Sequence, residues 1–278
     1  ELQKDGPVTN PNDKSSPVEI KPNIYQLPSV KPGSHVYLIK GETKNVLIDT
    51  GVTAGFERLK DQLSQLDLTP DDIHLIILTH EHFDHIGATP FFESAIVAAH
   101  ANAANKIDLQ DEFVTYNKER NIGIKPFYPH VWLDDGTIID IGNYKLEVIH
   151  TPGHTSGCIC LYEPNMKLLF SGDTVFAGGS LSDIAGSGSI SDYLRSINRL
   201  GNLKIEAFYP AHGWLSIQPE GDLEKATEYA RSVMEESKLL FEALARSEAR
   251  QKVKQRLAKA PMSGVSRPPK PDTAEKTK

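Results

Sequence analysis

The sequence has few cysteines and no long apolar run. Only two of its 278 residues are cysteine, which argues against a disulfide-stabilised scaffold. Cys158 and Cys160 lie two positions apart on an expected strand and share a face, where a disulfide between them would be strained. We interpret both as reduced structural thiols. No apolar segment approaches the roughly 18 residues that a membrane-spanning helix requires, so we expect no membrane span.

The given sequence also leaves no secretory h-region to interpret. The chain begins at Glu1 rather than at methionine, so we expect that the native N-terminus was processed or trimmed. The composition, with 39% hydrophobic residues and a net charge of −7, is typical of a soluble globular protein. The sequence does not determine the cellular compartment, and we favour a cytoplasmic location.

Positive charge is concentrated at the C-terminal end. Residues 246–278 contain ten Lys or Arg and three Asp or Glu, a local charge of +7, so the remainder carries −14. A basic tail can bind nucleic acid or anionic lipid. The acidic remainder disfavours broad nucleic-acid binding, and we interpret the tail as a solvated chain end.

Composition and periodicity divide the chain into four parts. Residues 1–17 are polar and predict a flexible N-terminal segment. Residues 18–218 predict one catalytic domain, and 219–259 predict a C-terminal helix that packs on it, with a homodimer seam as the alternative use of its apolar stripe. Residues 260–278 contain four prolines and predict a disordered tail.

Within 18–218, turn residues and apolar periodicity predict strands and helices. The expected strands are 18–26, 35–40, 45–49, 73–78, 95–99, 137–140, 144–149, 158–162, 167–170 and 207–210. Helices are expected from about Phe56, Asp84 and Ala101, and over 190–200. The irregular aromatic segment 111–133 predicts either a lid or a packed surface loop. The Gly- and Ser-rich segment 177–190 predicts a mobile loop, and both segments are candidates for shaping specificity.

Five of the ten histidines lie in short polar motifs where expected strands end. The four motifs are Thr79-His80-Glu81-His82-Phe83-Asp84-His85, Thr151-Pro152-Gly153-His154-Thr155, Ser171-Gly172-Asp173-Thr174 and Tyr209-Pro210-Ala211-His212-Gly213. Imidazole and carboxylate groups suit zinc and other first-row metals. These groups are too many for one tetrahedral ion, so we expect two. Asp173 stands alone in its motif and is the candidate to bridge them. The other five histidines are interpreted as structural: His35, His74, His100, His130 and His150.

The motifs resemble those of the metallo-β-lactamase superfamily over roughly residues 18–215. The resemblance implies an α+β fold, an αββα sandwich of two mixed β-sheets flanked by helices, with metals at one sheet edge. The ligand sets that it implies are His80, His82 and His154 for the first metal, and Asp84, His85 and His212 for the second, with Asp173 as the bridge. Asp49 resembles the family's carboxylate that orients a ligand histidine.

Several residues differ from those typical of known branches of the superfamily, and these differences disfavour those branches. The true β-lactamases carry Cys or Ser where Asp173 stands, and acyl-homoserine lactonases tend to carry Tyr where Phe176 stands. Asp173 and His212 are only 39 positions apart, which leaves no room for the long insert of one nuclease branch. Residues 151–157 and 171–179 are similar to the glyoxalase-II-like group, which cleaves thioesters.

The expected function is therefore a dinuclear metal-dependent hydrolase. A metal-bridging hydroxide would attack an ester, thioester or lactone carbonyl, and Asp84 would orient it and take its proton. We expect two Zn²⁺ ions, with Fe or Mn as alternatives, and a small-molecule substrate. The site charge of roughly +1 favours an anionic one. Two other activities of the superfamily stay open: an iron-dependent persulfide dioxygenase, and a phosphodiesterase or nuclease supported only by the basic tail.

Overall fold

The computed structural model describes residues 16–29, 31–117, 123–245, 251 and 255. The chain falls into two compact units, Glu1–Met234 and Glu235–Lys278. The first unit contains both β-sheets. Among the described residues, no helix combines the length and the apolar character needed to cross a membrane.

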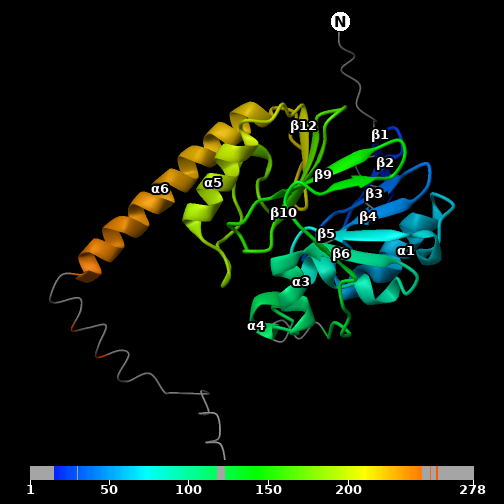
Figure 1. Ribbon diagram of the computed structural model, residues 1–278, viewed down its shortest axis with the longest axis horizontal. Coiled ribbons are helices and arrows are strands. Elements are labelled where there is room, and N and C mark those ends of the chain that lie inside the picture. The colour runs from blue at the N-terminus through cyan, green and yellow to red at the C-terminus, as the bar shows by residue number, and fades with distance from the viewer. Residues whose placement is uncertain (1–15, 30, 118–122, 246–250, 252–254, 256–278) are drawn as a thin grey trace, which may run out of the picture. The chain divides into compact units, whose positions relative to one another are not determined.

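Seven strands form the first sheet, in the order of the sequence (Figure 1). They are β1 (Val18–Lys21), β2 (Ile24–Leu27), β3 (Val36–Lys40), β4 (Asn45–Ile48), β5 (Leu75–Leu78), β6 (Ile96–His100) and β7 (Val131–Leu133). Strands β1 to β4 pair antiparallel, and β4 to β7 pair parallel. The central strands β4 and β5 are apolar on both faces, which is typical of strands covered on both sides.

Five strands form the second sheet, in the order β12, β11, β10, β9, β8. Their bounds are β8 (Ile138–Asp140), β9 (Lys145–His150), β10 (Ile159–Glu163), β11 (Leu168–Gly172) and β12 (Ala207–Pro210). All neighbours pair antiparallel except β11 and β12, which are parallel. The carboxyl ends of β11 and β12 therefore lie side by side at one edge.

The helices connect and cover these strands. The α-helices are α1 (Phe56–Ser64), α2 (Phe83–Ile86), α3 (Ala101–Asp108), α4 (Glu112–Thr115), α5 (Ile190–Leu200) and α6 (Pro219–Ala245). Short 3₁₀ turns are η1 (Thr53–Gly55), η2 (Pro70–Asp72), η3 (Thr89–Phe91) and η4 (Ala177–Gly179).

Three apolar clusters define the layers. One lies between the sheets and includes Ile48 and Ile77 from the first sheet and Val148 and Phe170 from the second. Another joins the outer face of the first sheet to α1 and α3. The third joins the second sheet to α5 and the first turns of α6. This layering confirms the predicted αββα sandwich of two mixed sheets flanked by helices.

Two sequence predictions about elements are wrong. The expected single strand 18–26 is two strands, β1 and β2, separated by a turn at Pro22 and Asn23. Proline has no N–H to donate to a strand ladder, and Asn23 has a φ of 61°, a left-handed conformation that asparagine tolerates better than most residues. The segment 111–133 is not wholly irregular, because it contains the one-turn helix α4, whereas the edge strand β7 begins at Val131, where the strand pattern resumes in the sequence.

The C-terminal helix begins at Pro219, as expected, because proline suits the first turn of a helix. Its described part ends at Ala245, and most of 246–259 lies outside the described residues. Leu223, Ala226 and Ala230 are buried, so the first turns of α6 bury their apolar stripe within the first unit. Residues 1–15, 260–278 and most of the basic tail also lie outside the described residues, and the four-part division stays a prediction.

Candidate metal centre

The seven side chains predicted as ligands come together where β5, β9, β11 and β12 end. Their potential ligand atoms form three overlapping groups, and within each group these atoms lie within 4.8 Å of one another. The groups are His80, His82 and His154; His80, His85 and Asp173; and Asp84, His85 and His212. Because His80 and His85 each belong to two groups, the three groups make one cluster.

Local structure explains why these side chains meet. The buried strand β5 ends at Leu78, and the chain turns through Thr79 into α2. The first turn of α2 is closed by the His85 amide, which donates to the carbonyl oxygen of His82 at 3.0 Å. On the second sheet, the amide of Ala211 donates to the carbonyl oxygen of Gly172 at 3.0 Å. This bond continues the parallel pairing of β11 and β12 and places Asp173 beside His212.

The two oxygens of Asp173 face different histidines. Its Oδ1 lies 3.5 Å from Nε2 of His85 and 3.5 Å from Nε2 of His212. Its Oδ2 lies 3.7 Å from Nε2 of His154 and accepts a hydrogen bond from the Ser182 hydroxyl at 3.1 Å. The carboxylate therefore stands between the two sides of the cluster.

Three histidines are oriented through their outer ring nitrogens. Nδ1 of His85 donates to Oδ2 of Asp49 at 2.8 Å, and Asp49 is 1% exposed. Nδ1 of His80 contacts the Thr79 hydroxyl at 3.2 Å, and Nδ1 of His154 donates to the carbonyl oxygen of Asp183 at 2.5 Å. Such bonds fix the ring and turn Nε2 toward the cluster, where Nε2 of His154 lies 2.9 Å from Nδ1 of His82. The Asp49 contact agrees with the role that the resemblance implied.

Several atoms that face the cluster are buried without a hydrogen-bond partner among the described residues. They include Nε2 of His80, Nε2 of His85 and Oδ1 of Asp173. A buried polar atom without a partner is costly. Nitrogen and carboxylate donors in this number and spacing suit divalent first-row cations. The residues present therefore fit a metal centre.

Electrostatics at the cluster agree with that fit. Burial, together with the neighbouring histidines, lowers the pKa of His80 and of His82 well below the ordinary value, so both are neutral and able to bind a metal. Burial lowers the pKa of His85, but the charges of Asp49, Asp173 and Asp84 outweigh burial and raise it to about 10. A cation would take the place of the proton that these carboxylates attract.

Sequence reasoning missed Glu81, a fully buried carboxylate between His80 and His82. Glu81 pairs with Nζ of Lys106 on α3 at 2.8 Å and accepts a hydrogen bond from the Thr155 hydroxyl at 3.1 Å. Lys106 also donates to the hydroxyl of Ser156 at 2.6 Å. The pair thus joins the segment of His82 to the segment of His154. Only the place of Glu81 inside the histidine motif could have pointed to it.

The remaining histidines and the cysteines have structural surroundings. Each of the five histidines interpreted as structural forms a hydrogen bond with a backbone group through a ring nitrogen: His35, His74, His100, His130 and His150. Cys158 and Cys160 are free and buried. Burial raises the pKa of Cys158 and raises that of Cys160 to about 11, so both thiols stay protonated and unreactive.

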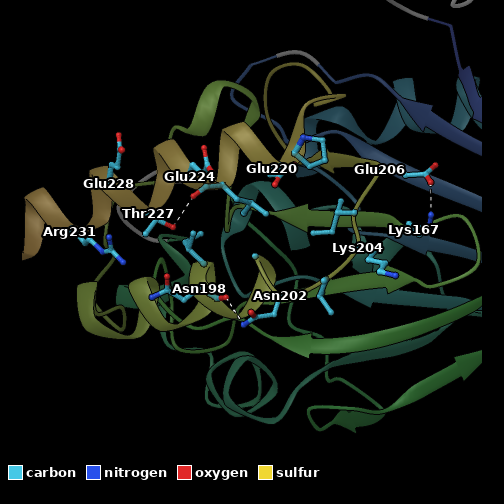
Figure 2. Close-up of a pocket in the computed structure, with 16 residues that line it drawn as sticks. Lys167, Asn198, Asn202, Lys204, Glu206, Glu220, Glu224, Thr227, Glu228 and Arg231 are labelled. Carbon is cyan, nitrogen blue, oxygen red and sulfur yellow. Dashed lines mark hydrogen bonds and ion pairs between the residues drawn. The ribbon is translucent and has the colours of Figure 1, made fainter. Parts of the chain in front are cut away.

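A separate groove of about 930 Å³ lies between α5, the residues before β12 and the first turns of α6. Figure 2 shows that charged and polar side chains line it, including the Lys167–Glu206 ion pair. None of the seven predicted ligands lines this groove. It is therefore distinct from the candidate metal centre.

Comparisons with known proteins agree with the geometry. Residues 31–212 match the family model described as the metallo-beta-lactamase superfamily. The chain is 34% identical over 202 residues to the acyl-coenzyme A thioesterase MBLAC2 of Gallus gallus, a match that covers 64% of this chain and 72% of that protein. It is 31% identical over 161 residues to the hydroxyacylglutathione hydrolase GloC of Haemophilus influenzae, covering 56% and 74% of the two chains.

A solved structure gives the same assignment. The metallo-beta-lactamase family protein TTHA1429 from Thermus thermophilus is 26% identical, with a TM-score of 0.66, and the match covers 77% of this chain and 81% of that one. The family model spans more than half of the sequence, and the motif residues that it includes converge in the fold. The chain belongs to the metallo-β-lactamase superfamily.

Proposed function

We propose that this metal-dependent hydrolase binds two divalent cations and cleaves thioester bonds. His80, His82 and His154 would hold one cation, and Asp84, His85 and His212 would hold the other. Asp173 would contact both. We propose Zn²⁺ for both positions because neutral imidazole and carboxylate are its usual ligands.

The observation that carries the proposal is the position of Asp173. Its Oδ1 is 3.5 Å from Nε2 of both His85 and His212, whereas its Oδ2 faces His154. A carboxylate whose two oxygens face separate groups of ligands supports a pair of cations rather than one. The buried Nε2 atoms of His80 and His85, which have no hydrogen-bond partner among the described residues, support the same interpretation.

The chain's own residues account for orientation and proton transfer. Bound divalent cations lower the pKa of coordinated water and polarise a carbonyl oxygen. Asp84 is 15% exposed, and its carboxylate lies 3.2 Å from Nε2 of His212. Burial raises the pKa of Asp84, but His85 and His212 outweigh burial and hold it well below the ordinary value. Asp84 is therefore ionised and can accept a hydrogen bond that orients the attacking water; we propose that it also takes the proton of that water.

The relatives support the choice of a thioester. One is named for acyl-coenzyme A and the other for hydroxyacylglutathione, and both names denote acyl groups bonded to sulfur. In this reaction the water oxygen adds to the carbonyl carbon and the carbon–sulfur bond breaks. The products are a carboxylic acid and a thiol, and no oxidant is consumed.

Metal analysis and a substrate panel test the proposal together. We expect two zinc ions per purified chain, and thiol release without oxygen from acyl-coenzyme A or acyl-glutathione thioesters. Lactones and phosphodiesters belong in the same panel. A single iron with oxygen consumption would overturn the proposal in favour of a dioxygenase, and cleavage of phosphodiesters alone would favour a nuclease.

A variant tests the role of Asp173 directly. Asp173→Ala should lose most bound metal and at least about 100-fold in rate, because the contact shared by both cations is removed. Asp140→Ala is the control, since Asp140 is an exposed carboxylate on β8. Wild-type metal content and rate in Asp173→Ala would rule out the bridging assignment.

A further inference from the structure

Two aromatic rings contact opposite sides of the candidate metal centre. The ring of Tyr116, directly after α4, lies 5.0 Å from the ring of His82. The ring of Phe176 lies 6.2 Å from the ring of His212. His82 and His212 belong to different ligand groups. Apolar surface therefore flanks the place where the reacting carbonyl has to lie.

The segment after Phe176 extends this apolar surface. Asp183 accepts a hydrogen bond from His154 through its carbonyl oxygen, and the amide of Ala185 donates to the carbonyl oxygen of His154 at 2.9 Å. Ile184 lies between these two anchored residues and is 42% exposed. The backbone therefore holds an exposed apolar side chain next to a predicted ligand.

The third segment follows His212. Trp214 lies two residues after this histidine and is 84% exposed, and Leu215 is 39% exposed. The turn before Trp214 is anchored, because the carbonyl oxygen of Gly213 lies 3.2 Å from Nε2 of His35. Single exposed apolar residues are common, but a gathering of them around a reaction centre indicates a binding surface.

The charge of the three segments indicates whether an anionic group or a hydrocarbon chain binds to this surface. The segments 111–116, 176–186 and 213–217 contain no Lys or Arg. They offer nothing to a phosphate group or to an anionic lipid headgroup. Their apolar side chains suit a hydrocarbon chain joined to the carbonyl at the metal centre.

We propose that Tyr116, Phe176, Ile184 and Trp214 bind the acyl chain of the substrate, so that the enzyme prefers extended acyl thioesters to short or hydroxylated ones. This inference rests on the proposed thioesterase function. It assigns the acyl half of the substrate to a defined surface and leaves the thiol half to other residues. Chain length, rather than the thiol carrier, would then determine selectivity at this surface.

A binding experiment tests this without requiring turnover. The sequence contains two tryptophans, so Trp132→Phe leaves Trp214 as the only one. S-alkyl thioethers of coenzyme A, from butyl to hexadecyl, have no carbonyl to cleave and are titrated below their micelle-forming concentrations. We expect saturable blue-shifted emission, with affinity rising about two- to four-fold for each buried methylene. Affinity that does not depend on chain length would overturn the proposal.

Steady-state kinetics provide a second test of the acyl-chain proposal. Trp214→Ala and Ile184→Ala should lower kcat/KM for a long-chain thioester at least about ten-fold, and should change the value for the acetyl thioester less than about two-fold. Trp132→Ala is the matched control, because Trp132 is a 51% exposed tryptophan on β7 and belongs to none of the three segments. An equal loss for both substrates would overturn the proposal, since these residues would then support the centre itself.

Two further outcomes are distinguishable. If no thioester is cleaved by the wild type, the proposed function fails, whatever the thioether titration gives. If Trp214 emission shifts with phosphatidylcholine vesicles but not with dissolved thioethers, a membrane is the occupant and the acyl-chain assignment is overturned.

Discussion

The hydroxyl of Tyr193 donates a hydrogen bond to the backbone carbonyl oxygen of Asp173, 2.9 Å away. The same phenolic oxygen accepts a hydrogen bond from the amide of Ser182 at 3.1 Å. Ser182 in turn donates to the Asp173 carboxylate. One buried tyrosine on α5 therefore holds both ends of the segment between Asp173 and Ser182.

Tyr193→Phe should weaken metal binding and stability together. The change keeps the ring but leaves a buried carbonyl and a half-buried amide with one partner fewer, at a cost of about 1–3 kcal/mol in the free energy of unfolding. Urea denaturation and metal titration measure the two effects. Tyr162→Phe is the matched control, because its hydroxyl donates to the carbonyl oxygen of Lys204 at 2.7 Å, on a residue outside the cluster. Equal metal affinity in the two variants would contradict a role of Tyr193 in positioning Asp173.

Lys106→Met should be strongly destabilising. It leaves the Glu81 carboxylate, which is 0% exposed, without its cation, and breaking a buried ion pair costs about 3–5 kcal/mol. Glu81→Gln in the same chain should restore part of the loss, because it removes the buried charge. Thermal and urea unfolding give the three values.

The control for this prediction is Lys167→Met. Lys167 and Glu206 form an ion pair whose side chains are 40% and 63% exposed. Such surface pairs contribute little to stability, because solvent screens them. If Lys167→Met costs as much as Lys106→Met, burial of the Glu81–Lys106 pair is not what makes it important.

Gly157→Ala should destabilise the protein by about 1–3 kcal/mol through overpacking. A Cβ at this position would lie 2.5 Å from Oε2 of Glu81 and 2.7 Å from Cβ of Ala103. Gly221→Ala in α6 is the opposite control, since nothing lies within 4 Å of its Cβ and alanine favours a helix by up to about 1 kcal/mol. Opposite signs are expected in chemical denaturation. A stable Gly157→Ala would mean that both the Glu81 side chain and the start of α3 at Ala103 can move away.

Acidification should weaken the fold through His100. Burial, together with the neighbouring His150, lowers the pKa of His100 to about 4, and Nδ1 of His100 accepts a hydrogen bond from the amide of Asn102. The unfolded chain takes up this proton near pH 6.5. The contribution of His100 is therefore complete above about pH 6.5 and is lost as the pH falls toward 4, by at most about 3 kcal/mol.

His100→Asn isolates this effect. Asparagine can accept the same hydrogen bond at the start of α3 but does not titrate. The difference in unfolding free energy between variant and wild type should change across pH 4 to 6.5, measured with chelator present in both. A difference that stays constant over this range would show that His100 does not carry the pH dependence.

The strands were predictable where the physical signal was local. The apolar runs of β5, β10 and β11 and their turn residues were sufficient to locate them. The break in 18–26 has its own signals in Pro22 and Asn23, because proline lacks an N–H and asparagine tolerates a left-handed turn. Helix α4 had no such signal, since an element of four residues depends on packing against the rest of the fold rather than on periodicity.

The side chains that meet at the candidate metal centre were predictable, but the residues that support them were not. Strand ends followed by His or Asp gave the seven side chains that meet. Glu81 and Tyr193 could not be found in this way, because their importance comes from contacts with Lys106 and Ser182 on other segments. An ordinary glutamate or tyrosine in a sequence carries no sign of such partners.

The loop after β5 belongs to the first sheet and carries His80, His82, Asp84 and His85, whereas Asp173 and His212 follow strands of the second. Two cations bound here would be held by residues of both sheets, so the distance between the cations would depend on the spacing of the two sheets. Tyr37 and Phe170, whose rings are 5.2 Å apart between those layers, help to set that spacing. Since interiors are close-packed and transmit strain, trimming either ring would alter which ionic radius is preferred, without touching a single ligand.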